Sequence, residues 1–297
     1  TEEPVEARLV VDCTSAVSPL HQAINHWQFP VTRHLLGSVF GQSRDVGAAA
    51  SAWGLNVFSL HLDPGRSLAW RYRFAGNQLQ AGCLVPPGAA GRADRVTAKS
   101  FLETGLDKAA VTGAYKEQTY GGPPLPVTCA DGYMAVGKAA GQENPFLPPD
   151  ISAAFSGVYL AYTAASHALT EGDTGAEMLW VYPRSYAREW GPSQAFAARA
   201  GLSLMNMDGT RLDQLLGSGW VDDYATACLV RNRVIEEAVI DRLSQALKSL
   251  HRLPAILAWT SALRKASRLA KLYTEAPYEW SPEAAAAWQQ KILAASQ

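Results

Sequence analysis

Cysteine and histidine side chains gather near the start of the sequence, where they could bind zinc. Cys13, His21, His26 and His34 lie within 22 residues, and thiolate and neutral imidazole are groups that zinc prefers. Structural zinc sites carry closely paired ligands such as Cys-x-x-Cys, and this segment has no such pair. We therefore predict that these residues form no metal site and that His26 packs beside Trp27.

A second set, His61, Asp63 and Cys83, could support nucleophilic catalysis by a thiol. His61 and Asp63 would share one face of a strand, and Cys83 could lie on a neighbouring strand. Such a site needs the imidazole within hydrogen-bond reach of the thiol. Asp63 directly precedes Pro64-Gly65, a position where aspartate commonly starts a tight turn. The sequence therefore favours a turn role for Asp63 and predicts no catalytic residue.

Two pairs of adjacent carboxylates are Asp222-Asp223 and Glu236-Glu237. Adjacent side chains point in different directions on a helix, so neither pair forms a shared site. Asp222 and Asp223 are expected where a helix begins, because acids favour its positive end. Nucleotide-binding glycine loops and the common zinc-protease and serine-hydrolase signatures do not occur in the sequence. The sequence therefore predicts no cofactor and favours a non-enzymatic protein.

One stretch of the chain is strongly basic. Seven Lys and Arg residues and no Asp or Glu lie between Arg242 and Lys271. Four of them fall along one side of a predicted helix: Arg264, Lys265, Arg268 and Lys271. The opposite side is left for packing by Leu263, Leu269 and Leu272. This side is either an ordinary solvated surface or a surface that binds RNA phosphates without sequence specificity, with an affinity that falls with salt.

The elements expected in the first half of the chain are mostly strands. Strands are predicted at Asn56–Leu62, Leu68–Phe74 and Gln78–Val85, because apolar and polar residues alternate there. With the turn at Asp63–Arg66 they would form a β-meander. A short helix is predicted at Lys99–Val111, followed by a long irregular region rich in Pro and Gly.

The second half is expected to be mainly helical. Apolar spacing and capping residues predict helices at Ile151–Leu169, Thr210–Leu216, Val221–Leu253, Ala255–Thr274 and from Ser281 onward. The first of these is interpreted as a buried helix. A short strand is predicted at Glu177–Tyr182, and Pro254 is expected to break or kink the helix before it. The predicted fold class is α+β, with a β-rich region at 1–145 and a helix-rich region at 146–297.

The chain carries little charge for its length. Lys, Arg, Asp and Glu make up 18% of the 297 residues, against about 25% in soluble domains. Such a composition suggests that protein partners cover part of the surface, either further copies of the chain or companion subunits. No apolar stretch is long enough for a membrane span, and four scattered cysteines suit a reducing compartment inside the cell.

In its low charge, abundant Trp and Tyr and glycine-rich loops, the sequence resembles capsid proteins of totivirus-like double-stranded RNA viruses. The segments that carry the resemblance are Gln118–Gly122, Asn144–Asp150 and Phe155–Leu160. The resemblance implies a structural shell subunit of α+β architecture with closed symmetric assembly, a face toward the RNA genome and a location in the virion. It would also make this chain a fragment or a cleaved product of a longer protein.

Two alternatives remain open. Val10–Cys13 followed by Ser18–His21 is similar to the opening strand and Pro-Leu-His turn of RNA-binding subunits of CRISPR effector complexes. The third hypothesis is a soluble enzyme whose site is built from scattered residues.

Overall fold

A computed structural model of the 297-residue chain describes most of the sequence. The described residues are 6–14, 18, 20, 33–43, 57–63, 67–73, 78–85, 106–120, 122–143, 151–231, 233–235 and 252–296. The chain divides into two compact units, which are described separately. One unit comprises residues 1–31, 120–204 and 213–297, and the other comprises residues 32–119 and 205–212. The division at residue 145 expected from the sequence, between a β-rich and a helix-rich region, stays a prediction.

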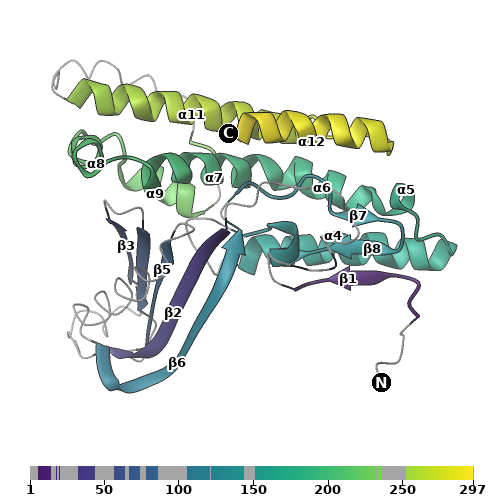
Figure 1. Ribbon diagram of the computed structural model, residues 1–297, viewed down its shortest axis with the longest axis horizontal. Helices are drawn as coiled ribbons and strands as arrows, with labels where there is room; N and C mark the ends of the chain where they lie inside the picture. Colours follow the sequence, from purple (N-terminus) through teal and green to yellow (C-terminus); the bar gives the residue numbers. More distant parts are fainter. Residues whose placement is uncertain are drawn as a thin grey trace. The chain divides into compact units, whose positions relative to one another are not determined.

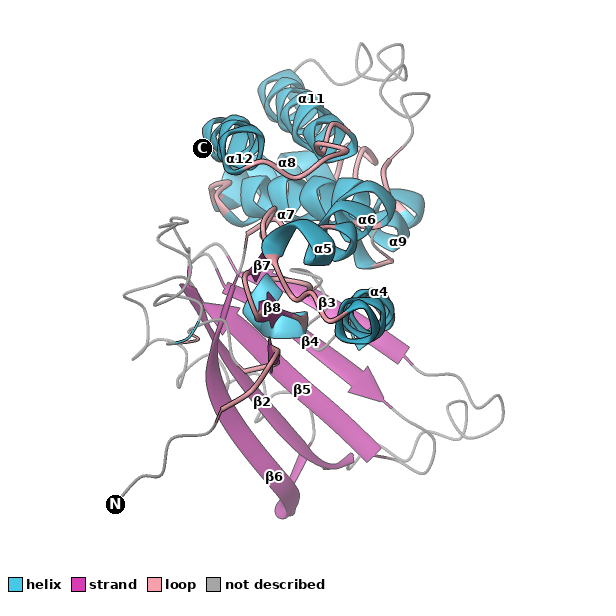
Figure 2. Ribbon diagram, turned by 90° about the vertical axis from the view of Figure 1, so that its right-hand side faces the viewer, coloured by secondary structure: helices cyan, strands magenta, loops and turns pink. Residues whose placement is uncertain are grey.

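The smaller unit is built on a five-stranded sheet (Figures 1 and 2). Its strands are β2 (Arg33–Ser43), β3 (Val57–Asp63), β4 (Ser67–Arg73), β5 (Gln78–Val85) and β6 (Leu106–Tyr120), arranged in the order β3-β4-β5-β2-β6. The three predicted strands are confirmed as β3, β4 and β5. The antiparallel register sets Leu60 opposite Trp70 and Leu62 opposite Leu68, so apolar positions share a face as their alternation requires.

The strand order departs from a clear meander, because β2 lies between β5 and β6. The helix predicted at Lys99–Val111 is wrong over its described part, since Leu106–Tyr120 forms the long strand β6. Pairing with β2 decides the conformation there, and strand preference depends more on such pairing than on the local sequence. The remainder of that predicted helix lies outside the described residues.

The larger unit contains a small mixed sheet of three short strands. These are β1 (Val10–Asp12), β7 (Cys129–Ala130) and β8 (Tyr133–Ala135), in the order β1-β8-β7. Strand β8 pairs in parallel with β1 and antiparallel with β7. The hairpin between β7 and β8 turns through Asp131 and Gly132, and Gly132 has φ 65°, a conformation that glycine adopts without steric cost.

Most of the described chain after β8 is helical. They are η2 (Gly137–Ala140), α4 (Ile151–Glu171), α5 (Ala176–Leu179), α6 (Val181–Glu189), α7 (Gly191–Met205), α8 (Gly209–Leu216), α9 (Asp223–Val230), α11 (Leu253–Thr274) and α12 (Pro282–Ser296). The predicted helices at Ile151, Thr210, Ala255 and Ser281 are confirmed. The hydroxyl of Ser281 accepts a hydrogen bond from the amide of Ala284 at 3.0 Å, as an N-cap should. None of the described helices is long and apolar enough to cross a membrane.

Three predictions for the second half of the chain need correction. Glu177–Tyr182 is not a strand, because α5 and α6 occupy it, and Pro183 falls in the first turn of α6, where a missing N–H costs nothing. The long helix predicted at Val221–Leu253 ends at Val230, and residues 233–235 are not helical. Pro254 stands in the first turn of α11, so it helps to start that helix and does not kink it.

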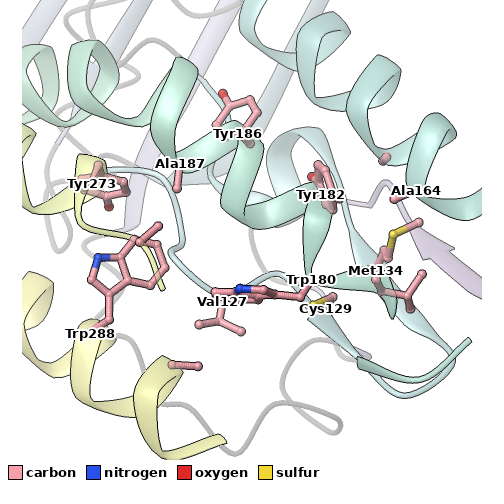
Figure 3. Packing of buried hydrophobic residues seen from close by; sticks show 14 of the residues in the cluster. Val127, Cys129, Met134, Ala164, Trp180, Tyr182, Tyr186, Ala187, Tyr273 and Trp288 are labelled. Atoms are coloured by element: carbon pink, nitrogen blue, oxygen red, sulfur yellow. The ribbon is translucent and has the colours of Figure 1, made fainter. Parts of the chain in front are cut away.

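Large aromatic side chains hold the core of the larger unit together (Figure 3). Trp180, between α5 and α6, meets Trp288 of α12 edge-on with ring centroids 6.2 Å apart. Trp288 meets Tyr273 of α11 at 6.1 Å in a similar geometry. The indole N–H groups of both tryptophans donate to backbone carbonyls, of Pro277 at 3.0 Å and of Leu272 at 2.7 Å. Each ring is therefore buried without leaving a polar atom unpaired.

The contact between α7 and Tyr273 gives a test of this packing. A Cβ added at Gly191 would lie 2.5 Å from Cδ1 and 3.1 Å from Cβ of Tyr273, and the Tyr273 hydroxyl is tied to the carbonyl of Pro124. We expect Gly191→Ala to lower the free energy of unfolding by about 1–3 kcal/mol in urea denaturation. The control Gly113→Ala meets no atom within 4 Å and should change it by less than about 1 kcal/mol. Equal losses in the two variants would contradict this packing.

Candidate functional site

The parallel strands β1 and β8 bring together two chain segments that are far apart in sequence. Asp12, the last residue of β1, stands opposite Ala135, the last residue of β8, and the amide of Val136 donates to the carbonyl of Asp12 at 2.9 Å. In sheets with parallel strands, ligands tend to bind just beyond the carboxyl ends of the strands. We therefore take the carboxyl ends of β1 and β8, with the residues that follow them, as the candidate site.

The carboxylate of Asp12 is the central polar group of this site. Its Oδ1 accepts from the amide and the hydroxyl of Thr14, at 3.0 and 2.6 Å. Its Oδ2 accepts from the hydroxyl of Ser18 and, at 2.9 Å, from that of Tyr133 in β8. Only 1% of Asp12 is exposed. Burial by itself raises the pKa of Asp12, but the hydrogen bonds from Ser18, Thr14 and Tyr133 outweigh it and hold the pKa below its ordinary value.

Tyr133 serves this site as a neutral donor. Burial raises the pKa of its hydroxyl, and the hydrogen bond to the Asp12 carboxylate and the negative charge of that group raise it further. A phenol with a raised pKa keeps its proton, so it continues to donate to the carboxylate across the range in which proteins work. The bond links β1 and β8 through their side chains as well as through their backbones.

A second buried network follows β8 and centres on Gln142. Its Oε1 accepts from the amide of Gly137 at 2.8 Å, and its Nε2 donates to the hydroxyl of Tyr182 at 2.8 Å. That hydroxyl donates in turn to the carbonyl of Ala135 at 2.8 Å. The amide group also lies against α4, where a Cβ added at Gly157 would come within 2.1 Å of Oε1. Gln142 therefore ties together β8, η2, α4 and α6.

An ion pair completes the polar groups that follow β8. Nζ of Lys138 lies 3.8 Å from Oε1 of Glu143, and the carboxylate side chain is only 6% exposed. The carboxylate of Asp12, both polar atoms of Gln142 and this ion pair are thus engaged with groups of the same chain. Chemically, these contacts fix the strands and helices around the site.

The basic residues singled out from the sequence lie elsewhere, on α11. Leu263 and Leu269 face the core, as the apolar side of the predicted helix required, and Leu272 is half-buried. The basic residues are all exposed: Arg264, Lys265, Arg268 and Lys271. An RNA contact through this surface stays a prediction from the sequence. Arg252, from the same basic stretch, has a structural role, because its guanidinium donates to the carbonyl of Gly217.

The structure does not place Cys83 on a strand next to that of His61, as a thiol site would need. The register places Ala69 of β4 opposite both His61 of β3 and Cys83 of β5, so His61 and Cys83 stand two strands apart, roughly 10 Å. In the histidine-rich segment, His21 and His26 lie outside the described residues. Among the residues that the structure describes, no group of three His, Cys, Asp or Glu could hold a metal ion.

Asp222 and Asp223 lie at the start of α9, as expected, and Asp222 is its N-cap. The side chain of Asp222 accepts from the amide of Ala225 at 2.8 Å.

Sequence reasoning missed Tyr133, Gln142 and Tyr182, which have no motif in common. A usable signal was the run Asp12-Cys13-Thr14-Ser15, a polar cluster that directly follows an apolar strand.

Comparison with known proteins identifies the fold. No protein-family model and no curated protein matches the chain. A geranylgeranyl bacteriochlorophyll reductase-like protein from Thermoplasma acidophilum matches with a TM-score of 0.62 and 13% identity, over 80% of this chain and 62% of that one. A triple mutant of the flavin-dependent brominase Bmp2 matches with a TM-score of 0.50 and 14% identity, over 85% and 64%. This chain therefore spans less than two thirds of either structure, and it shares their fold.

The shared fold corrects the capsid hypothesis, which is wrong. The aromatic residues that suggested subunit contacts serve in large part to fill the core, since Trp180, Trp259 and Tyr273 are buried. The structural shell role and the virion location, which depended on that resemblance, are wrong as well. The opening strand invoked for the CRISPR alternative exists as β1, where it pairs with β8. The comparisons support the third hypothesis better than the capsid hypothesis.

Replacement of Asp12 by Asn tests the network at β1. An amide would set an N–H donor against the hydroxyl donors of Ser18, Thr14 or Tyr133, so we expect Asp12→Asn to cost about 1–3 kcal/mol in urea denaturation at neutral pH. Because the folded carboxyl has the lower pKa, its contribution is complete above the ordinary value of 3.8 and is lost as the pH falls through the lowered pKa. The stability gap between wild type and Asp12→Asn should therefore narrow below pH 3.8.

The exposed carboxylate of Asp213 on α8 provides the control. Asp213→Asn should leave the free energy of unfolding within about 0.5 kcal/mol of wild type. A gap between wild type and Asp12→Asn that stayed constant in acid would show that the carboxylate is not stabilised in its ionised form.

Proposed function

We propose that the chain is the framework part of a flavin-dependent oxidoreductase. The observation that carries the proposal is the backbone likeness to the reductase-like protein, at a TM-score of 0.62 over 80% of this chain. The likeness to the brominase, which is flavin-dependent by name, supports the same chemistry at a lower TM-score of 0.50. In this proposal the flavin, when bound, supplies the redox chemistry, and this chain positions the elements around it.

The polar residues at the carboxyl ends of β1 and β8 do not fit direct binding of a flavin nucleotide. Such a ligand needs donors for its phosphates and acceptors for its ribose or ribityl hydroxyls. Asp12 already accepts four hydrogen bonds from the chain, and both polar atoms of Gln142 are engaged. The 297 residues also contain no G-x-G-x-x-G loop to cradle a pyrophosphate. We therefore assign the flavin ligands to other residues.

The two buried networks have a positioning role in this proposal. Asp12 and Tyr133 hold β1 against β8. Gln142 and Tyr182 hold β8, η2 and α6 in place beside α4. Elements that frame a site keep their geometry best when their own side chains are locked by packing and by hydrogen bonds. The networks would therefore act on a flavin site through the stability of its surroundings.

Flavin content tests the proposal. The protein is purified through an affinity tag from the cells that produce it, together with any chain that accompanies it, and the flavin released by denaturation is measured by fluorescence. We expect close to one flavin per protein. The absence of flavin from the purified protein, together with no binding of added FAD or FMN, would overturn the proposed function.

The same measurement on Asp12→Asn separates a framework role from a ligand role. Flavin content per folded protein should equal that of wild type and of the control Asp213→Asn, while the thermal midpoint falls only for Asp12→Asn. A folded Asp12→Asn protein that had lost its flavin would show that Asp12 binds the cofactor directly.

A further inference from the structure

The long helix α4 contains almost no charge. Residues 151–170 include no Asp, Glu, Lys or Arg, and Glu171 ends the helix. The inner side of α4 is buried and lined by small residues, namely Ala153, Gly157, Ala161, Ala164 and Ala168. They let α4 pack closely on η2 and α6. The sequence predicted a buried helix here, and this prediction holds for the inner side only.

The outer side of α4 exposes large apolar side chains. Phe155, Tyr159 and Tyr162 are 65%, 70% and 69% exposed, and their i, i+4, i+7 spacing aligns them along the helix. Val158 and Leu169 are 47% and 39% exposed beside them. We call these five residues the α4 aromatic face. An exposed apolar patch of a few hundred Å² is often a functional contact surface, so this face is a candidate for one.

Three of the hydroxyl groups along α4 are hydrogen-bonded within the helix. Ser156 donates to the carbonyl of Ser152 at 3.1 Å, Thr163 to that of Tyr159 at 3.0 Å, and Thr170 to that of Ser166 at 2.8 Å. Each bond reaches back four residues. Burial of an unpaired hydroxyl is costly, whereas burial of a paired one is not. These three hydroxyls therefore place little penalty on burial of the helix surface around them.

We propose that the α4 aromatic face is a dimer interface that packs against the same face of a second copy of the chain. In a twofold interface both copies contribute the same surface, so a face with a net charge would meet the same net charge on the other copy. A face without Lys, Arg, Asp or Glu meets no such repulsion. Helices that bind lipid surfaces instead carry Lys and Arg beside their apolar side, and α4 has neither.

The exposed aromatic rings supply roughly half of the area that each partner of a standard dimer interface buries. Full burial of an aromatic side chain removes roughly 150–250 Å² from water, so three rings about two-thirds exposed contribute roughly 300–500 Å² per copy. Val158, Leu169 and the helix surface between them bring this toward the roughly 800 Å² per partner of a standard interface. Tyrosines at the centre of such a contact are typical binding hot spots.

Mass measurement in solution tests the proposal. The wild-type chain of 31.9 kDa should sediment as a dimer of twice that mass in analytical ultracentrifugation. Tyr159→Arg would bring two like charges to the interface and should raise the dimer dissociation constant by at least about 100-fold. Tyr162→Ala removes a ring without adding charge and should raise it by about 10-fold. Circular dichroism checks that both variants keep the wild-type helix content.

Leu257→Arg is the matched control, because Leu257 is 53% exposed on α11 and outside the α4 aromatic face. It should leave the mass at that of the wild-type dimer. A wild-type monomer would overturn the proposal, as would a dimer that persists in folded Tyr159→Arg. A monomer that sediments with anionic phospholipid vesicles would identify a membrane surface as the partner instead. Flavin content does not depend on any of these outcomes, so the dimer proposal and the proposed function are tested independently.

Discussion

The parallel pairing of β1 with β8 is the interaction on which the rest of the larger unit depends. Two strands of three residues each give few backbone hydrogen bonds, and isolated short strands are marginal in water. The carboxylate of Asp12 adds what the backbone lacks, since it binds Tyr133 across the pair while Thr14 and Ser18 close around it. The segment before β1 is fixed as well. The guanidinium of Arg8 donates to the carbonyl of Leu169 near the end of α4, and the backbone carbonyl of Arg8 accepts from the hydroxyl of Thr174.

This pair also explains why a buried charge is tolerated in the larger unit. An ionised carboxylate out of water is expensive unless several donors surround it. Asp12 receives four, from three side-chain hydroxyls and one amide, so its ionised form is favoured although it is buried. The network around Gln142 uses the same principle with neutral groups. Both networks attach to β8, one through the hydroxyl of Tyr133 and the other through the carbonyl of Ala135.

Local sequence determined those elements that could be predicted. The strands at β3, β4 and β5 follow from alternation, and α4, α11 and α12 follow from apolar spacing and caps such as Ser281. Elements set by distant partners were missed: β6 is a strand because β2 pairs with it, and α5 and α6 replace a predicted strand because Trp180 and Tyr182 pack in an aromatic core. The candidate site escaped prediction for the same reason. Asp12 and Tyr133 meet only after folding, and no spacing in one sequence reveals such a pair.

The distance along the chain between Asp12 and Tyr133 has a consequence for biosynthesis. The two residues are 121 positions apart, and a ribosome adds roughly 5–20 residues per second. Strand β1 therefore emerges from the ribosome roughly 6–24 seconds before its partner exists. During that interval Val10, Val11 and the unpaired backbone of β1 are exposed to other chains, and an open strand edge is a template for wrong pairing. The amino-terminal strand of this protein would be a natural place for a chaperone to bind while synthesis continues.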